Sequence, residues 1–122
     1  MASYISKYFY GKRYSQDDLI PIVVLVLGTS GGKAKKQYVE ETIYDLLQIE
    51  FTKDFYQVRV ANASVPRWKH YIAWARERAK QNHGFIKSAK FARRGTWELT
   101  PEGTVFFNQL VEVINNTKND QT

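Results

Sequence analysis

Residues 66–103 read PRWKHYIAWARERAKQNHGFIKSAKFARRGTWELTPEG, and this stretch decides the fold. Apolar residues at helical spacing predict a helix over 66–82, and Gly84 suits its end. Two short extended pieces, 85–87 and 95–100, predict a β-hairpin. The pattern Thr-Pro-Glu-Gly then starts a new helix, because threonine caps helices well and proline suits the first helical position. The predicted order is therefore helix, hairpin, helix.

The helix over 66–82 has one apolar face and one cationic face. With Ala75 at the centre of the buried stripe, 100° per residue places five residues on the same side: Trp68, Tyr71, Ile72, Ala79 and Asn82. The opposite face carries Lys69, His70, Ala73, Arg76, Glu77 and Lys80, and the hairpin tip carries Lys90, Arg93 and Arg94. Two neighbouring cationic elements indicate a surface for a polyanion, and duplex DNA suits this geometry best.

The polar face also predicts a division of labour on DNA. A small side chain at Ala73 would let the helix approach base edges, and the Arg76 guanidinium matches the O6 and N7 acceptors of guanine. Lys69 and the hairpin cations suit phosphate contacts, which position the protein without reading sequence. Three further cations, Lys33, Lys35 and Lys36, precede or begin another predicted helix, whose N-terminus could hold a phosphate.

The rest of the chain supplies the other elements of one domain. A nearly all-apolar helix, capped by Ser15 or Asp17 and with Pro21 in its first turn, runs to about residue 27 and should be central and buried. The segment GTSGG ends it. A short extended piece, a helix over 36–47 and a loop over 57–65 follow. The last helix has an apolar stripe of Val105, Phe106, Leu110, Val113 and Ile114.

These elements divide the chain into three parts: an aromatic and basic N-terminal arm (1–16), a domain (17–116) and a polar tail (117–122). The trace of helix, short strand, helix, helix and hairpin predicts an α+β, mainly helical fold, a winged helix-turn-helix with a small antiparallel β-hairpin wing. Trp74 and Trp97 are expected in the core or at its edge.

Composition narrows the function classes. The chain has 122 residues, 43% of them hydrophobic, which suits one folded domain, and its net charge of +6 favours an anionic partner. There are no cysteines, which excludes disulfides and thiolate metal sites. The longest apolar run, nine residues, is too short to cross a bilayer. We expect a cytoplasmic protein with no membrane partner, metal, cofactor or catalytic site.

A family resemblance sharpens the expectation. The pieces Pro66-Arg67-Trp68, Trp74-Ala75-Arg76, Gly84-Phe85-Ile86 and the run from Arg94 to Gly103 (RGTWELTPEG) resemble the N-terminal DNA-binding domain of Mrr-type, modification-dependent restriction endonucleases. The likeness is strong over about a third of the chain, and residues 17–65 agree only in the order of their elements. The family joins this domain to a nuclease domain, of which this chain shows no trace.

The resemblance implies a specificity module that docks on double-stranded DNA and can sense a methylated base, N6-methyladenine or 5-methylcytosine. It assigns DNA contact to Arg67, Trp68, Lys69, His70 and Arg76, with a nuclease domain or subunit as a further partner. Trp68 and Tyr71 could form a methyl pocket, since methyl groups in the major groove are read by apolar contact. The alternative for Trp68 is that it closes the core under the helix, and its angle favours that reading.

Other functions fit the same fold. A winged-helix transcriptional regulator would need a homodimer, with Phe106, Phe107, Leu110 and Val113 as a seam, whereas a reader module can be a monomer. A winged helix used only for protein contacts would show no salt-sensitive DNA binding, and the aromatic N-terminal arm would be its interface.

Overall fold

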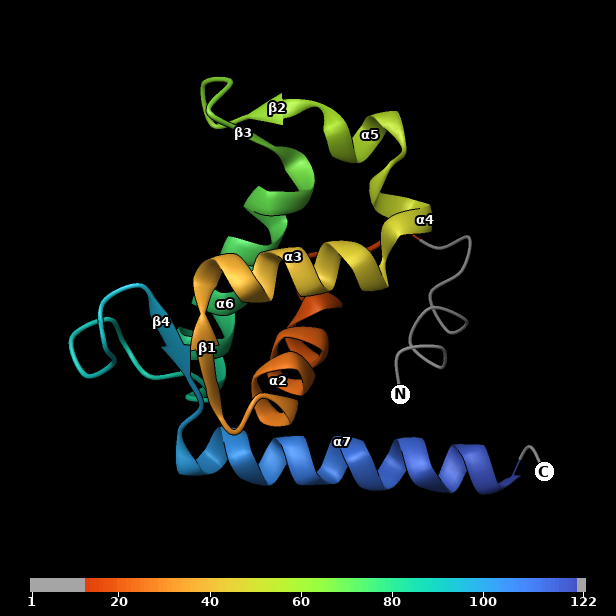
Figure 1. The fold of residues 1–122 in the computed structure, drawn as a ribbon, viewed down its shortest axis with the longest axis vertical. Coiled ribbons are helices and arrows are strands. Elements are labelled where there is room, and N and C mark those ends of the chain that lie inside the picture. Colours follow the sequence, from red (N-terminus) through yellow and green to blue (C-terminus); the bar gives the residue numbers. More distant parts are fainter. Residues whose placement is uncertain (1–12, 121–122) are drawn as a thin grey trace.

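The computed structural model describes residues 13–120, with side chains up to residue 116. The expected arm therefore lies mostly outside the described residues. The fold is mainly helical with two small antiparallel sheets (Figure 1). Its elements are α2 Leu19–Thr29, β1 Lys33–Lys35, α3 Lys36–Leu46, α4 Gln48–Phe51, α5 Asp54–Gln57, β2 Arg59–Val60, β3 Val65–Pro66, α6 Arg67–His83, β4 Thr96–Glu98 and α7 Pro101–Asp120.

Helix α2 forms the centre of the fold, as its apolar sequence predicted. Eight of its eleven residues are buried, and α3, α6 and α7 pack around it (Figure 1). Ser15 and Asp18 stabilise the turn that leads into α2: the N–H of Ser15 donates to Oδ2 of Asp18 at 2.8 Å, and the N–H of Asp18 donates to Oγ of Ser15 at 3.1 Å. This reciprocal pair closes the turn before the helix, whose N-cap residue is Asp18 and has no side-chain cap hydrogen bond, so the expected cap by Ser15 or Asp17 is not found at the N-cap position.

The sheet beside α6 joins distant parts of the chain. Strand β4 pairs antiparallel with β1, with Ala34 opposite Trp97. The other edge of β4 meets the segment after α6, through an antiparallel bridge between Ile86 and Leu99 and a 2.9 Å hydrogen bond from the N–H of Lys87 to the carbonyl of Glu98. Of the predicted hairpin, the second strand is present as β4, whereas residues 85–87 contribute this isolated bridge and no strand. The loop over 88–95 connects the two.

Two predicted helix boundaries are confirmed. Gly84 ends α6 in the left-handed conformation (φ 67°), with the N–H of Phe85 donating to the carbonyl of Ala79 at 3.0 Å. Thr100 caps α7, because its Oγ1 accepts a 3.0 Å hydrogen bond from the N–H of Gly103. Pro101 is the first residue of α7, as expected.

Several expectations about single elements are wrong. The stretch over 57–65 is not only a loop: β2 and β3 pair antiparallel across it, and Ala61, Asn62 and Ala63 at the tip all have positive φ. Helix α7 continues to Asp120, past the boundary expected at 116. The side chains of Val105 and Val113, expected in its apolar stripe, are 56% and 59% exposed. Phe107 and Val111 pack on the core instead, beside Phe106 and Leu110.

The buried face of α6 also differs from the prediction at two positions. Ile72, Ala75 and Ala79 are buried as expected, and Trp97 on β4 is in the core. Trp74 is 46% exposed, however, so its assignment to the core is wrong. Asn82 is exposed because α6 reaches past the core in its last turn. None of the helices between residues 13 and 120 combines the length and apolar character that crossing a membrane requires.

Candidate nucleic-acid interface

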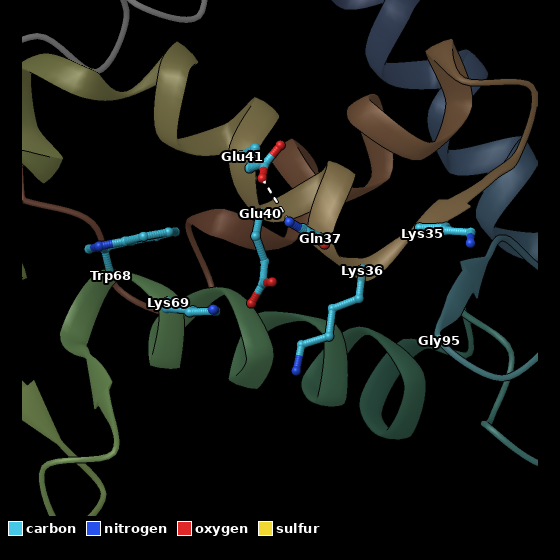
Figure 2. Close-up of a pocket in the computed structure, with 8 residues that line it drawn as sticks. All are labelled: Lys35, Lys36, Gln37, Glu40, Glu41, Trp68, Lys69 and Gly95. Atoms are coloured by element: carbon cyan, nitrogen blue, oxygen red, sulfur yellow. Dashed lines mark hydrogen bonds between the residues drawn. The ribbon is translucent and has the colours of Figure 1, made fainter.

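A groove between α3 and α6 is lined by cations from both helices (Figure 2). It encloses about 530 Å³, within the size range of small-ligand sites. We call it the α3–α6 groove. Its lining residues are Lys35, Lys36, Gln37, Glu40, Glu41, Trp68, Lys69 and Gly95.

A second hollow of about 450 Å³ lies at the base of the loop over 88–95, and we call it the loop-base hollow. It is lined by Arg76, Ala89, Arg93, Arg94, Gly95, Thr96 and Trp97, with no acidic residue. Gly95 lines both hollows, and its carbonyl accepts a 3.0 Å hydrogen bond from the N–H of Lys36. The two hollows are therefore neighbours.

The cations around the two hollows form one cationic band. Its members come from β1, α3, α6 and the hairpin loop, which are far apart in sequence: Lys35, Lys36, Lys69, Arg76, Arg93 and Arg94. The structure thus brings together six of the cations that the sequence singled out. The electric field of clustered like charges attracts a polyanion more strongly than the field of the same charges scattered over the surface.

Arg76 is less accessible than its expected role requires. Its side chain is 14% exposed, its Nη1 lies 3.1 Å from Oε2 of Glu77, and its guanidinium lies 5.7 Å from the centre of the Trp97 ring. Its Nε is buried and donates no hydrogen bond within the described residues. The side chain is thus held between α6 and β4, and it does not stand free for a bidentate guanine contact.

Glu77 reduces the positive charge on the outer face of α6. It contacts both Arg76 and Lys80, and its carboxylate oxygen lies 2.7 Å from Nζ of Lys80. The hydrogen bond from Lys80, together with the charges of Lys80 and Arg76, holds the pKa of Glu77 below its usual value despite some desolvation. Lys80 is therefore paired, and it lines neither hollow of the band.

The other α6 residues that were expected to contact DNA lie outside the two hollows. The Arg67 guanidinium donates a 3.1 Å hydrogen bond to the carbonyl of Phe55 and lies 4.2 Å from the centre of the Phe55 ring. Arg67 therefore joins α6 to α5. His70 lies edge-on to the exposed Trp74, with ring centres 6.1 Å apart. Ala73 is half-buried. None of these residues lines the two hollows.

Trp68 and Tyr71 do not form the single methyl pocket that was expected. Trp68 packs against Tyr44, with ring centres 4.6 Å apart, and against Phe51 at 6.1 Å, while it also lines the α3–α6 groove. Tyr71 lies against Tyr56 and lines a separate hollow beside Asp17. The two side chains line different hollows, so they do not share one pocket.

Two expected cations flank the band. Lys33 is exposed on β1, opposite Glu98, and helps Lys87 to hold the pKa of that carboxyl below its usual value. Lys90 is exposed on the hairpin loop, beside the 75% exposed Phe91.

Glu40 is the residue of this site that the sequence analysis missed. Its side chain reaches into the α3–α6 groove between Lys36 and Lys69 (Figure 2), yet the residue is only 5% exposed. Burial raises the pKa of Glu40, against the opposing effect of Lys69 and Lys36. A signal existed: Glu40, Ile43 and Leu47 follow the i, i+3, i+7 spacing of a buried stripe, which places a carboxylate where an apolar side chain is expected.

Within the described residues, no cluster of three or more His, Asp or Glu side chains could hold a metal ion. No protein-family model, curated protein or solved structure matches the chain.

Proposed function

We propose that this chain is a winged-helix module that binds double-stranded DNA through the cationic band. One observation carries the proposal: six Lys and Arg residues from four segments meet around two adjoining hollows. The order α2, β1, α3, α6, hairpin agrees with a winged helix, in which β1 pairs with the hairpin. The insertion of α4, α5, β2 and β3 before α6 distinguishes this chain from the simplest form of that fold.

The geometry favours phosphate contact as the main source of affinity. Lys35, Lys36 and Lys69 are point charges beside an open groove, and Arg93 and Arg94 are exposed on a loop. Such contacts set the position of a protein on DNA and bind any sequence. We assign Arg76 to the same role, since Glu77 and Trp97 hold its guanidinium at the base of the loop.

The residues shared with Mrr-type restriction endonucleases support a narrower proposal, in which the module selects DNA for a modification-dependent restriction system. The same surface would serve a transcriptional regulator if the protein formed a dimer. A protein-interaction role is favoured by two exposed aromatic side chains, Trp74 and Phe91, because aromatic residues are enriched at protein interfaces.

Titration against matched duplexes at two salt concentrations tests these proposals. The duplexes are unmodified, N6-methyladenine and 5-methylcytosine versions of one sequence. Salt-sensitive binding to all three supports the DNA-binding module, and tighter binding to one modified duplex supports the restriction reader. Absence of binding to any duplex at low salt would overturn the proposal and leave the protein-interaction role.

A further inference from the structure

The α3–α6 groove holds a buried acceptor that the protein itself leaves unused. Oε2 of Glu40 is buried and accepts no hydrogen bond from any described residue. A buried polar atom without a partner costs free energy, so each such atom in a folded protein calls for an explanation. Figure 2 shows this carboxylate directed into the groove, toward α6. The carboxylate that carries this unpaired atom thus forms part of the groove wall.

The groove also offers an aromatic surface. Trp68 lines one end of it, and the rings of Tyr44 and Phe51 pack against the indole. The Phe51 and Trp68 rings are within 29° of parallel, with centres 6.1 Å apart. A ring held in this way keeps its orientation when a ligand arrives. Nucleobases stack on such aromatic side chains in many single-strand and flipped-base sites.

Three ammonium groups complete the site. Lys35, Lys36 and Lys69 line the same groove, and they suit a negatively charged group such as a phosphate. The ligand that uses all three features is flat and aromatic, donates an N–H, and carries phosphate. These are the properties of a nucleotide whose base bears an exocyclic amino group.

We propose that the α3–α6 groove receives one unpaired nucleotide of bound DNA, with its base against Trp68 and its exocyclic amine donating to Glu40. The inference rests on the proposed DNA-binding function. Cytosine and adenine carry such an amine, whereas uracil and thymine present a carbonyl at the corresponding position. An ionised carboxylate only accepts hydrogen bonds, so it repels the carbonyl of uracil. Glu40 therefore selects for the amine.

Duplexes with a single bulged base test this selection. One duplex carries a bulged cytosine, one carries uracil at the same place, and a fully paired duplex is the reference. We expect the wild-type protein to bind the cytosine bulge about 10-fold more tightly than the uracil bulge, because hydrogen bonds to charged groups are the stronger ones. Equal affinity for both bulges, with salt-sensitive binding retained, would overturn the pocket but not the DNA-binding function.

Variants at neighbouring positions separate the pocket from general binding. A Glu40→Gln carboxamide can donate to uracil as well as accept from cytosine, so the ratio of the two affinities should fall to about one. Asp45→Asn is the matched control, because Asp45 is exposed on the same helix and lines neither hollow. It should keep the wild-type ratio. A Glu40→Gln protein that still prefers cytosine would overturn the proposal, and loss of all duplex binding by the wild type would overturn both proposals.

Discussion

At the scale of single residues, the buried carboxylate of Glu40 lowers the stability of the fold at the place where the proposed ligand binds. Desolvation raises its pKa above the unfolded value, while Lys69 and Lys36 oppose the shift and Glu41 adds to it. The folded state therefore takes up a proton more readily than the unfolded state. The resulting stabilisation is present below the unfolded pKa and is lost as the pH rises through the folded pKa. Above its raised folded-state pKa, the charge on Glu40 is held at a cost in folding free energy.

Glu40→Gln should accordingly raise the free energy of unfolding at pH 7 relative to the wild type. The gain should shrink toward about pH 3, where the wild-type carboxyl is protonated in both states. Urea unfolding of both proteins at the two pH values measures this difference. Asp45→Asn should show no comparable gain, since Asp45 is exposed on the same helix. A Glu40→Gln protein that is less stable at pH 7 would refute the assignment of Glu40 as a costly buried charge.

Alanine substitutions at Trp74 and Trp97 test which of the two side chains belongs to the core. Trp97 is 6% exposed, and its replacement by alanine should cost about 3–5 kcal/mol of unfolding free energy, as for other large core residues. Trp74 is 46% exposed, and Trp74→Ala should cost no more than about 0.5 kcal/mol. Chemical denaturation of both variants checks the contrast. Similar losses at the two positions would mean that Trp74 belongs to the core after all.

The same neighbourhood shows why the sequence could not place every side chain. Trp74 and Arg76 stand about 100° to either side of Ala75, at the two borders of the buried stripe. Helical periodicity alone therefore does not predict which of the two border residues is buried. The outcome depends on β4, which packs Trp97 over the Arg76 side and leaves the Trp74 side open. Contacts from outside the helix therefore buried the cation and exposed the indole.

At the scale of elements, local rules located the ends of helices well. Gly84, Thr100 and Pro101 act through backbone groups within a few residues, and the sequence contains all of that information. The β2–β3 hairpin was not predicted, because its tip lacks the residue type that marks such a turn in a sequence. Its tip holds Ala61, Asn62 and Ala63 at φ of 53–63°, a conformation that usually signals glycine, and none is present.

The start of α7 offers an element-scale prediction. A Cβ at Gly103 would lie 2.1 Å from the carbonyl oxygen of Phe85, so the hairpin strand and the helix approach closely only because this residue is glycine. Since the backbone cannot yield as a flexible side chain does, Gly103→Ala should cost about 1–3 kcal/mol or more. Thermal unfolding measures the loss, with Asn108→Ala on the exposed face of α7 as a control. A Gly103→Ala protein as stable as this control would contradict the close approach.

At the scale of the whole molecule, the sequence predicted which residues are cationic, and the fold decided which of them act together. Lys80 and Arg67 were expected to reach DNA, yet one is paired with Glu77 and the other is bound to Phe55. Lys35 and Lys36 lie beside the hairpin loop that carries Arg94 only because β1 pairs with β4. Long-range strand pairing of this kind leaves no short-range signal in the sequence. The extent of the cationic band is therefore a property of the tertiary structure.

The size of the band predicts how binding depends on salt. If all six cations contact phosphates, the logarithm of the association constant should fall against the logarithm of salt concentration with a slope of about −5. Lys36→Ala and Arg94→Ala should each make the slope shallower by about one, on specific and random duplexes alike. Arg59→Ala is the control, since Arg59 is exposed on β2 and lines neither hollow.

Fluorescence anisotropy across a range of salt concentrations gives the slope for each protein. Equal slopes for the wild type and both band variants would show that DNA binds elsewhere. A loss at Arg59 as large as that at Arg94 would show that net charge, and not the arrangement of the band, determines affinity. The predicted pattern requires both the pairing of β1 with β4 and the position of the hairpin loop beside α3. The salt slope therefore tests the tertiary structure and the function together.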